Sequence, residues 1–258
     1  MPVNYVSVEE GMADDGLRMV VVSGVPSPWG EAAKGIFHIK GLEWRAVRLA
    51  YDDDDLKKWT RRNLSGPIAF YGDDPPRSGW AEILMLAERL APTPSLLPSD
   101  PLERALMVGL SHEILGEEGL LWLRRLQAVD WGLNGQEGGF APPVAKYLSQ
   151  KYGYTEGRGD EISIRITALL TLLSDRLEAQ QAAGSAFYFG DQLSALDIYS
   201  AAAMALFAPL PDKDCPLPPP VRAAFETTDD ATRAALKPIL LTHRDKMYGE
   251  FLETPLCL

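Results

Sequence analysis

The sequence has few cysteines, few basic residues and no long apolar run, and each shortage excludes a class of protein. Its 258 residues include two cysteines, Cys215 and Cys257, so neither a disulfide framework nor a cysteine-based metal site is expected. The formal net charge of -11 argues against nucleic-acid binding, which relies on Lys and Arg to neutralise phosphates. No apolar run approaches the roughly 20 residues of a membrane span, and residues 1–16 do not resemble a signal peptide. We therefore expect a cytoplasmic protein without a membrane partner, in which residues 1–16 form a loose tail.

Motifs of several common enzyme classes are also missing. The chain has no Gly-x-Ser-x-Gly elbow, no P-loop and no dinucleotide fingerprint, which excludes the usual hydrolase and nucleotide-binding sites. Its histidines, His38, His112 and His243, are widely separated, and no His-x-x-x-His spacing occurs. The four aspartates at 52–55 are interpreted as a solvated loop or a helix start. We expect neither a metal nor a nucleotide cofactor.

The first part of the chain carries alternating strand and helix patterns. Residues 19–22 and 44–49 are predicted to be strands on either side of a helix over 28–40, which makes a βαβ unit. A third strand is predicted at 68–71 and a further helix at 79–90, where apolar residues recur with helical spacing. The pattern predicts an α+β domain.

A proline-rich segment at 92–100 interrupts this periodicity and has the composition of an interdomain linker. The remainder reads as helical. Apolar residues four apart mark two of these helices, with Leu102, Leu106 and Leu110 in one and Ile164, Ala168, Leu172 and Leu173 in the other. The predicted helices span residues 101–116, 161–181, 195–207 and 229–250.

The helix predicted at 195–207 has a distinct start signal. Ser194 and Asp197 have the spacing of a capping box, and Leu193 and Ile198 occupy the positions of a hydrophobic staple. The helix is apolar on nearly all sides, so we expect it to be central in the helical region.

The segment Ser27-Pro28-Trp29-Gly30-Glu31 is the most informative in the chain. It follows the strand predicted at 19–22 and opens a helix, where unpaired backbone N–H groups favour an anion. Proline is common at the first helical position, and serine is a preferred N-cap. The residues alone therefore leave two interpretations of Ser27, a helix cap or a reactive group.

Two shorter signals follow it. Gly66-Pro67 precedes the strand at 68–71, and Arg77-Ser78 precedes the helix at 79–90. Proline is tolerated at the start of a strand, and about 5–6% of X-Pro bonds are cis in folded proteins, so the sequence by itself favours trans. Ser78 has the ordinary interpretation of an N-cap.

Together with Ser27 and the capping box at Ser194, these segments resemble the glutathione transferase family, in particular its serine-type bacterial members. The resemblance covers nearly the whole chain after Gly16, and the order of the parts is more specific than any one motif. It implies a thioredoxin-like N-terminal domain, followed by an all-helical C-terminal domain. The implied boundaries are a glutathione-binding domain at 17–91, a linker at 92–100 and a helical domain at 101–258.

The resemblance also implies roles for individual residues. Ser27 matches the family's catalytic residue, whose hydroxyl stabilises the thiolate of glutathione. Gly66-Pro67 matches the family's cis-proline, beside which the backbone binds the cysteinyl part of glutathione. Ser78 matches the serine that binds the γ-glutamyl carboxylate. Glutathione would then be a co-substrate for attack on a small electrophile, in a homodimeric detoxification enzyme.

An acceptor pocket is implied next to Ser27. Its candidate residues are Trp29, His112, Glu113 and Trp122, of which His112 and Glu113 interrupt an otherwise apolar helix. The ordinary interpretation of such a histidine is a surface or hydrogen-bonded core residue, and that of the tryptophans is packing.

Two positions depart from the family pattern. Arg77 stands where the family usually has Glu or Gln, and its guanidinium would repel an ammonium but could bind a carboxylate in bidentate fashion. Gly30 stands where a Cys-Pro-x-Cys motif has its second cysteine, so dithiol chemistry is excluded at this helix. These departures leave two alternatives to a transferase: a noncatalytic binding protein with the same fold, and a glutathione-dependent isomerase or reductive lyase.

Overall fold

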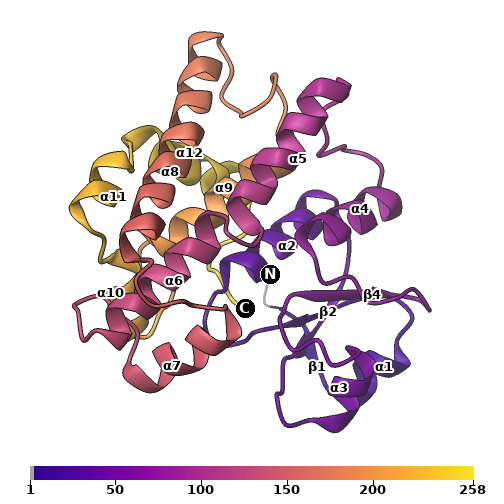
Figure 1. Ribbon diagram of the computed structural model, residues 1–258. Coiled ribbons are helices and arrows are strands. Elements are labelled where there is room, and N and C mark those ends of the chain that lie inside the picture. Colours follow the sequence, from indigo (N-terminus) through magenta and orange to yellow (C-terminus); the bar gives the residue numbers. More distant parts are fainter. Residues whose placement is uncertain (1–2) are drawn as a thin grey trace. The chain divides into compact units, whose positions relative to one another are not determined.

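The computed structural model describes residues 3–258 and divides into two compact units (Figure 1). The first unit runs up to Leu96 and also contains Pro211–Pro216 and Glu250–Leu258. The second contains Leu97–Leu210 and Leu217–Gly249. The division after Leu96 falls inside the segment expected to be a linker. The two later segments of the first unit were not expected, because 101–258 had been assigned to the helical domain.

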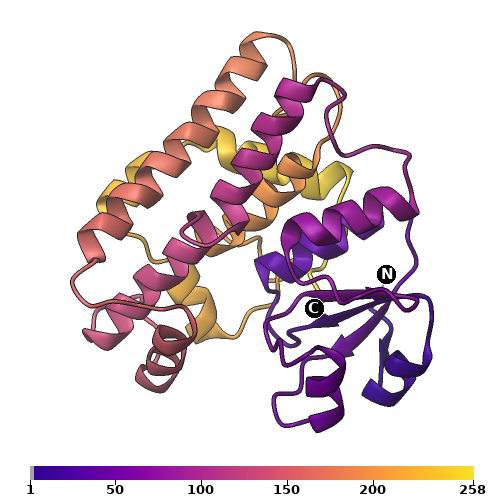
Figure 2. The same ribbon diagram turned by 45° about the vertical axis from the view of Figure 1, so that its right-hand side comes forward.

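The first unit is built on a four-stranded sheet in the order β1-β3-β2-β4. Strands β1, β3 and β2 are parallel, and β4 is antiparallel to β2. Helices α2 and α4 cover one face of the sheet, and α1 and α3 cover the other (Figures 1 and 2). The predicted βαβ unit is confirmed, as are the third strand and the helix after it. The elements are β1 (Tyr5–Val6), α1 (Val8–Ala13), β2 (Leu17–Val21), α2 (Pro28–Ile39), β3 (Arg45–Arg48), α3 (Asp54–Trp59), β4 (Ile68–Tyr71) and α4 (Trp80–Leu90).

The prediction of a loose tail at 1–16 is wrong for the described residues. They contain strand β1 and helix α1, which begins with a capping box between Ser7 and Glu10. The buried guanidinium of Arg18 donates from Nε to the carbonyl of Gly11 at 3.2 Å and from Nη1 to that of Gly16 at 2.6 Å. A Cβ on Gly11 would lie 2.6 Å from Cγ2 of Val47, so α1 packs closely on β3. Residues 1 and 2 lie outside the described part.

A buried lysine joins the end of α2 to the segment that leaves the sheet. The ammonium group of Lys40 is fully buried and lies 2.5 Å from Oε1 of Glu88, on α4. It also donates to the carbonyl oxygens of Ala91, at 2.9 Å, and Pro94, at 2.6 Å. Because an unpaired buried charge is costly, these contacts hold the three segments together.

The second unit is helical throughout its regular structure. Among the described residues, no helix combines the length and the apolar character needed to span a bilayer. The helices α6, α7 and α10 had not been predicted. The elements are α5 (Pro101–Leu115), α6 (Leu120–Leu133), α7 (Pro142–Lys151), α8 (Gly159–Ala182), α9 (Ala195–Ala203), the 3₁₀ helix η1 (Met204–Leu206), α10 (Pro219–Glu226), α11 (Asp230–Ala235) and α12 (Pro238–Glu250).

Two details of the helical prediction are corrected. The helix expected over 229–250 is broken into α11 and α12 at Pro238, which cannot continue a helix because it lacks a backbone N–H. The two series of apolar residues spaced four apart, on α5 and α8, are not wholly buried. Leu102 is 81% exposed and Leu106 is 47% exposed, although Leu110 is buried. On α8, Ile164 is 71% exposed.

Arginine 124 connects α6 to two other segments of the second unit. Its buried guanidinium donates from Nε to the carbonyl of Leu206 at 3.0 Å. Nη2 donates to three carbonyls at the end of α10, those of Ala224, Phe225 and Thr227, at 3.1, 3.3 and 2.5 Å. Burial lowers the pKa of Arg124 to about 10. The cation satisfies carbonyl groups that a helix end leaves unpaired.

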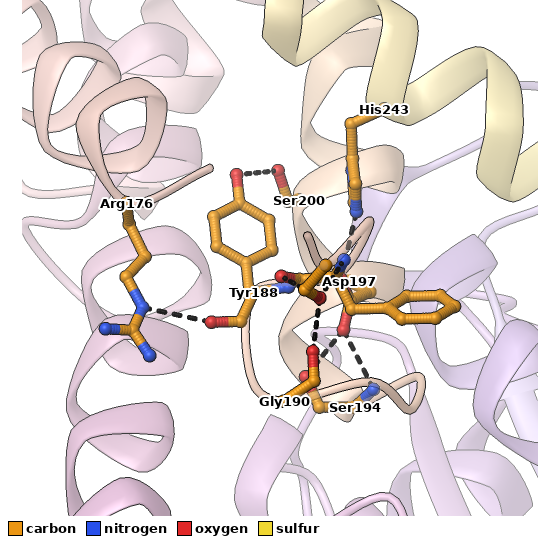
Figure 3. A network of polar contacts seen from close by, with 9 residues as sticks. Arg176, Tyr188, Gly190, Ser194, Asp197, Ser200 and His243 are labelled. Atoms are coloured by element: carbon orange, nitrogen blue, oxygen red, sulfur yellow. Dashed lines mark hydrogen bonds and ion pairs between the residues drawn. The ribbon is translucent and has the colours of Figure 1, made fainter. Parts of the chain in front are cut away.

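Helix α9 is buried along its whole length, as expected, and a network of polar contacts fixes its start (Figure 3). Ser194 and Asp197 form the predicted capping box. Oδ2 of Asp197 accepts from the backbone N–H of Ser194 at 2.8 Å and from its hydroxyl at 2.7 Å. Oδ1 of Asp197 accepts from the backbone N–H of Tyr188 at 3.0 Å and lies 2.9 Å from Nε2 of His243. One buried carboxylate therefore joins α9, the loop before it and α12.

The same network extends to α8. The hydroxyl of Tyr188 lies 2.9 Å from that of Ser200, on α9, and Nε of Arg176, on α8, donates to the carbonyl of Tyr188 at 3.0 Å. Burial raises the pKa of Tyr188, so this phenol remains protonated. Figure 3 shows Tyr188 between Arg176 on one side and the start of α9 on the other.

We expect Ser194→Ala to lower the free energy of unfolding by about 1 kcal/mol, the usual net contribution of a hydrogen bond, because it removes the hydroxyl that donates to Asp197. Asp197→Ala should cost more, because each buried donor left without an acceptor costs about 1–3 kcal/mol. Urea denaturation followed by circular dichroism measures both changes. Asp191→Ala, which removes an exposed carboxylate from the same loop, is the matched control and should leave the midpoint unchanged. An unchanged midpoint for Asp197→Ala would contradict the role given to this carboxylate.

Candidate functional site

The strand register places the cis-proline segment beside the end of β2. Val20 of β2 is opposite Ile68 of β4, so Pro67 lies at the level where β2 ends. The bond Gly66-Pro67 is cis, as predicted. A Cβ on Gly66 would lie 3.2 Å from the carbonyl oxygen of Val20, so only a glycine fits comfortably there. The chain leaves β2 at this end of the sheet and enters α2 through Ser27.

Ser27 occupies the N-cap position of α2, but its side chain makes no capping hydrogen bond. Its backbone is extended, and its carbonyl oxygen accepts from the N–H of Glu31 at 2.8 Å, the first bond of the helix. Pro28 follows at the first helical position. Ser27 therefore lacks the hydrogen bond from its side chain to a backbone N–H of the first turn that would make it an ordinary helix cap. The half-buried hydroxyl lies at the positive end of the helix dipole.

Arg77 continues the sheet beyond β4 through a single antiparallel bridge to Ala69, with N–O distances of 2.8 and 2.9 Å. Its guanidinium faces an acidic neighbour, since Nη2 lies 3.8 Å from Oδ2 of Asp74. Asp74 also accepts a hydrogen bond from Arg89, which is the main reason that the pKa of Asp74 is lowered. Nε of Arg77 is buried and has no hydrogen-bond partner in the described part of the chain.

Because Ser78 follows Arg77, the antiparallel bridge places it at the same end of the sheet as Pro67. The N-cap of α4 is Gly79 and not Ser78, which corrects the ordinary interpretation of this serine. The backbone N–H groups of Ser78 and Gly79 both donate to Oε2 of Glu82, at 3.0 and 3.1 Å. A carboxylate of the chain itself thus accepts from the backbone amides of Ser78, to which the resemblance assigns a ligand carboxylate, and of Gly79.

Sequence reasoning missed Glu82. The available signal was its position three residues after Gly79, the spacing of a capping box. It went unnoticed because Ser78 had been placed at the cap, one residue too early.

The residues expected in an acceptor pocket are divided between the two units. Trp29 belongs to the first unit, and His112, Glu113 and Trp122 belong to the second. Trp29 is half-buried in the first turn of α2. His112 is exposed on α5, and Glu113 forms an ion pair with Arg165 of α8. The ring of Trp122 makes an edge-on contact with Tyr152, with centroids 4.7 Å apart. In the second unit these side chains make surface and packing contacts, and their role in a pocket stays a prediction.

A metal centre has no candidate among residues 3–258, where no cluster of three or more His, Cys, Asp or Glu side chains could hold an ion. The polar groups at this end of the sheet are instead the Ser27 hydroxyl, the amides of Ser78 and Gly79, which donate to Glu82, and the Arg77 guanidinium, which faces Asp74. These are donors suited to an anion.

Comparisons with known proteins support the fold. No family model and no curated protein matches the sequence. A glutathione transferase from Methylobacterium radiotolerans, solved with glutathione sulfonate, is 16% identical, with 91% of each chain covered and a TM-score of 0.58. A glutathione transferase family member from Pseudomonas fluorescens, with two glutathione molecules bound, is 13% identical over 92% of this chain and 97% of its own, with a TM-score of 0.56. A beta-etherase from Sphingobium is 16% identical over 90% and 99%, also with a TM-score of 0.56.

These similarities establish the fold class predicted from the sequence. The chain has the glutathione transferase fold, in which a thioredoxin-like N-terminal part is followed by an all-helical part. At this level of identity the similarity concerns the architecture alone.

Proposed function

We propose that this protein is a glutathione transferase in which Ser27 stabilises the thiolate of glutathione for attack on a small electrophile. The observation that carries the proposal is the Ser27 side chain. It lies at the N-terminus of α2 and yet makes no capping hydrogen bond, so its hydroxyl can donate to a ligand. The cis Gly66-Pro67 segment lies at the same end of the sheet and supports the proposal.

The chemistry requires an anion at neutral pH. A free thiol with a pKa near ~8.5 is mostly protonated there, and a hydrogen-bond donor lowers that value by stabilising the charged form. The Ser27 hydroxyl supplies one donor, and the dipole of α2 adds positive potential. The sulfur then forms a bond to the electrophilic atom, whose leaving group departs with the electron pair. Ser27 keeps its proton throughout.

The γ-glutamyl end of glutathione would meet Ser78, Gly79 and Arg77. A ligand carboxylate can accept from the amides of Ser78 and Gly79 only by displacing Glu82, which accepts from both. Arg77 adds a positive charge that favours a carboxylate and disfavours an ammonium. We propose that the ligand carboxylate exchanges with Glu82 and that Arg77 contributes to this exchange.

A noncatalytic binding protein is the second candidate, and the same contacts favour it. Glu82 satisfies the amide pair of α4 without a ligand, and Arg77 is paired with Asp74. The Ser27 hydroxyl counts against this candidate, because a protein without the activity would not require a hydroxyl that makes no capping hydrogen bond.

We expect Ser27→Ala to raise the pKa of bound glutathione by one to two units, because a charge-assisted hydrogen bond contributes roughly 1.5–3 kcal/mol, at about 1.36 kcal/mol per unit. The thiolate absorbance of glutathione, titrated against pH at saturating ligand, measures the shift. The affinity should change less, because the thiol form loses little. Ser27→Thr, which retains a hydroxyl donor and adds no thiol, is the matched control and should leave the pKa of bound glutathione close to its value in the wild type.

Superimposable titration curves for wild type and Ser27→Ala would rule out the catalytic role. Glutathione that does not bind to the wild type at all would favour the noncatalytic candidate.

We expect Glu82→Gln to bind glutathione roughly two- to fivefold more tightly, because a neutral amide competes for a helix N-terminus by about 0.5–1 kcal/mol less than a carboxylate. Isothermal titration calorimetry measures the change. Glu43→Gln removes an exposed carboxylate elsewhere in the first unit and is the matched control. Weaker binding by Glu82→Gln would mean that Glu82 helps to form the ligand site and does not compete for it.

We also propose that the protein is a homodimer that uses α5. Leu102 and Leu106 lie one turn apart on this helix and are 81% and 47% exposed, and a second copy would cover these two apolar side chains.

We expect Leu102→Lys to shift the sedimentation coefficient from that of a dimer to that of a monomer, and Ile164→Lys, on α8, to leave it unchanged. A wild-type chain that sediments as a monomer at micromolar concentration would contradict the proposal.

A further inference from the structure

A hollow of about 520 Å³ lies in the first unit, and the residues that line it include Pro26 but not Ser27. Its walls are the ends of β1 and β3, the loop that follows β2, and the segment 256–258, with Pro216 alongside. Its volume lies within the range of roughly 300–1,000 Å³ that is typical of small-molecule sites. The hollow opens where the parallel strands β2 and β3 end, the edge at which α/β sheets commonly bind ligands.

The hollow has one basic side chain among the residues that line it, Arg48. Arg48 lines it at the end of β3, and its guanidinium lies 4.3 Å from the ring centroid of Tyr5. Within residues 3–258, Arg48 takes part in no ion pair, whereas Arg45 on the same strand is paired with Asp14. The hydroxyl oxygen of Tyr5, on the same wall, is buried without a hydrogen-bond partner in that range, and burial raises the pKa of this phenol. The hollow therefore offers a guanidinium and an unused hydroxyl to an anionic ligand.

A free thiol faces the same space. Cys257 lines the hollow, is partly exposed and forms no disulfide. Nζ of Lys34, on α2, lies 3.7 Å from its Sγ. Lys34 is almost fully buried and lies 2.6 Å from Oε2 of Glu31. A partly exposed thiol beside a buried ammonium is the setting in which cysteines act as nucleophiles.

The segment that carries Cys257 is fastened to α2. The backbone N–H of Leu258 donates to Oε1 of Glu31 at 3.2 Å, and Leu256 donates to the carbonyl of Asp214 at 2.7 Å. The side chains of Leu256 and Leu258 are both buried. A Cβ on Gly30 would come within 3.0 Å of Cδ1 of Leu258, so the segment lies directly on the first turn of the helix. The thiol is thus held at a defined place on the wall of the hollow.

We propose that this hollow binds a small disulfide that carries carboxylates, and that Cys257 exchanges with it to form a mixed disulfide. The sulfur of Cys257, having given up its proton, attacks one sulfur of the ligand. A new S–S bond forms, the S–S bond of the ligand breaks, and the released thiolate takes up the proton. No other oxidant is needed, because the ligand disulfide is reduced by the same two electrons that oxidise the Cys257 sulfur. Arg48 binds a carboxylate of the ligand and sets its position.

Glutathione disulfide is the probe that tests this site. We expect intact-mass spectrometry to show one glutathionyl group per chain and peptide mapping to place it on Cys257. Cys257→Ser should abolish the adduct. Cys215→Ser should retain it, because Cys215 is only 1% exposed and lies outside the hollow. Ser27→Ala should also retain it, which separates this site from the proposed transferase site.

Arg48→Gln tests the carboxylate contact. We expect it to slow the reaction with glutathione disulfide roughly tenfold, the effect of losing one charge-assisted contact. It should leave the reaction with the uncharged bis(2-hydroxyethyl) disulfide unchanged. The proposal is overturned if Cys257 of the folded protein forms no adduct, if Cys215 reacts equally fast, or if Arg48→Gln slows both disulfides alike.

Discussion

The parallel pairing of β2 with β3 is the constraint on which the rest of the first unit depends. Val21 is opposite Arg48, so both strands end at one edge of the sheet, and the helix that connects them must begin there. That start is Ser27. Antiparallel β4 enters the sheet at the same edge, and this brings Gly66-Pro67 and Ser78 to it. The donor groups of the two candidate sites therefore share one edge of the sheet.

The two sites differ in whether the protein itself supplies an acidic partner to the groups that would bind an anion. At α4, the amides of Ser78 and Gly79 are satisfied by Glu82, so a ligand has to compete with the protein. At the hollow, Arg48 has the ring of Tyr5 for a neighbour and, within residues 3–258, takes part in no ion pair. Competition lowers affinity and gives selectivity for ligands that offer further contacts, whereas an unpaired cation attracts anions of many kinds.

Much of this arrangement could be predicted because its signals are local. The strand at 68–71, the helix from Pro28 and the box at Ser194 each depend on residues within a few positions of one another. Strand β1 and helix α1 escaped prediction because a two-residue strand and a six-residue helix are too short for a hydrophobic period to emerge.

Other features depended on distant partners. Glu31 reads as an ordinary first-turn acid, but its carboxylate accepts from Leu258, which is 227 positions away. His243 reads as an isolated histidine, but it meets Asp197 across 46 positions. No local sequence pattern predicts such contacts, because the residues come together only when the chain has folded. The same is true of the position of Cys257 beside Lys34.

The return of residues 250–258 to the sheet has a consequence for how the protein forms during synthesis. Domains generally fold as units, with the N-terminal one first, as the chain emerges from the ribosome. Here the first unit lacks Pro211–Pro216 until Leu97–Leu210 have been translated, and it lacks Glu250–Leu258 until the whole helical unit has been translated. Until then the buried pair of Glu31 and Lys34 is without its cover of Leu258. The packing of the first unit on α2 is therefore completed only after residues 250–258 have been made.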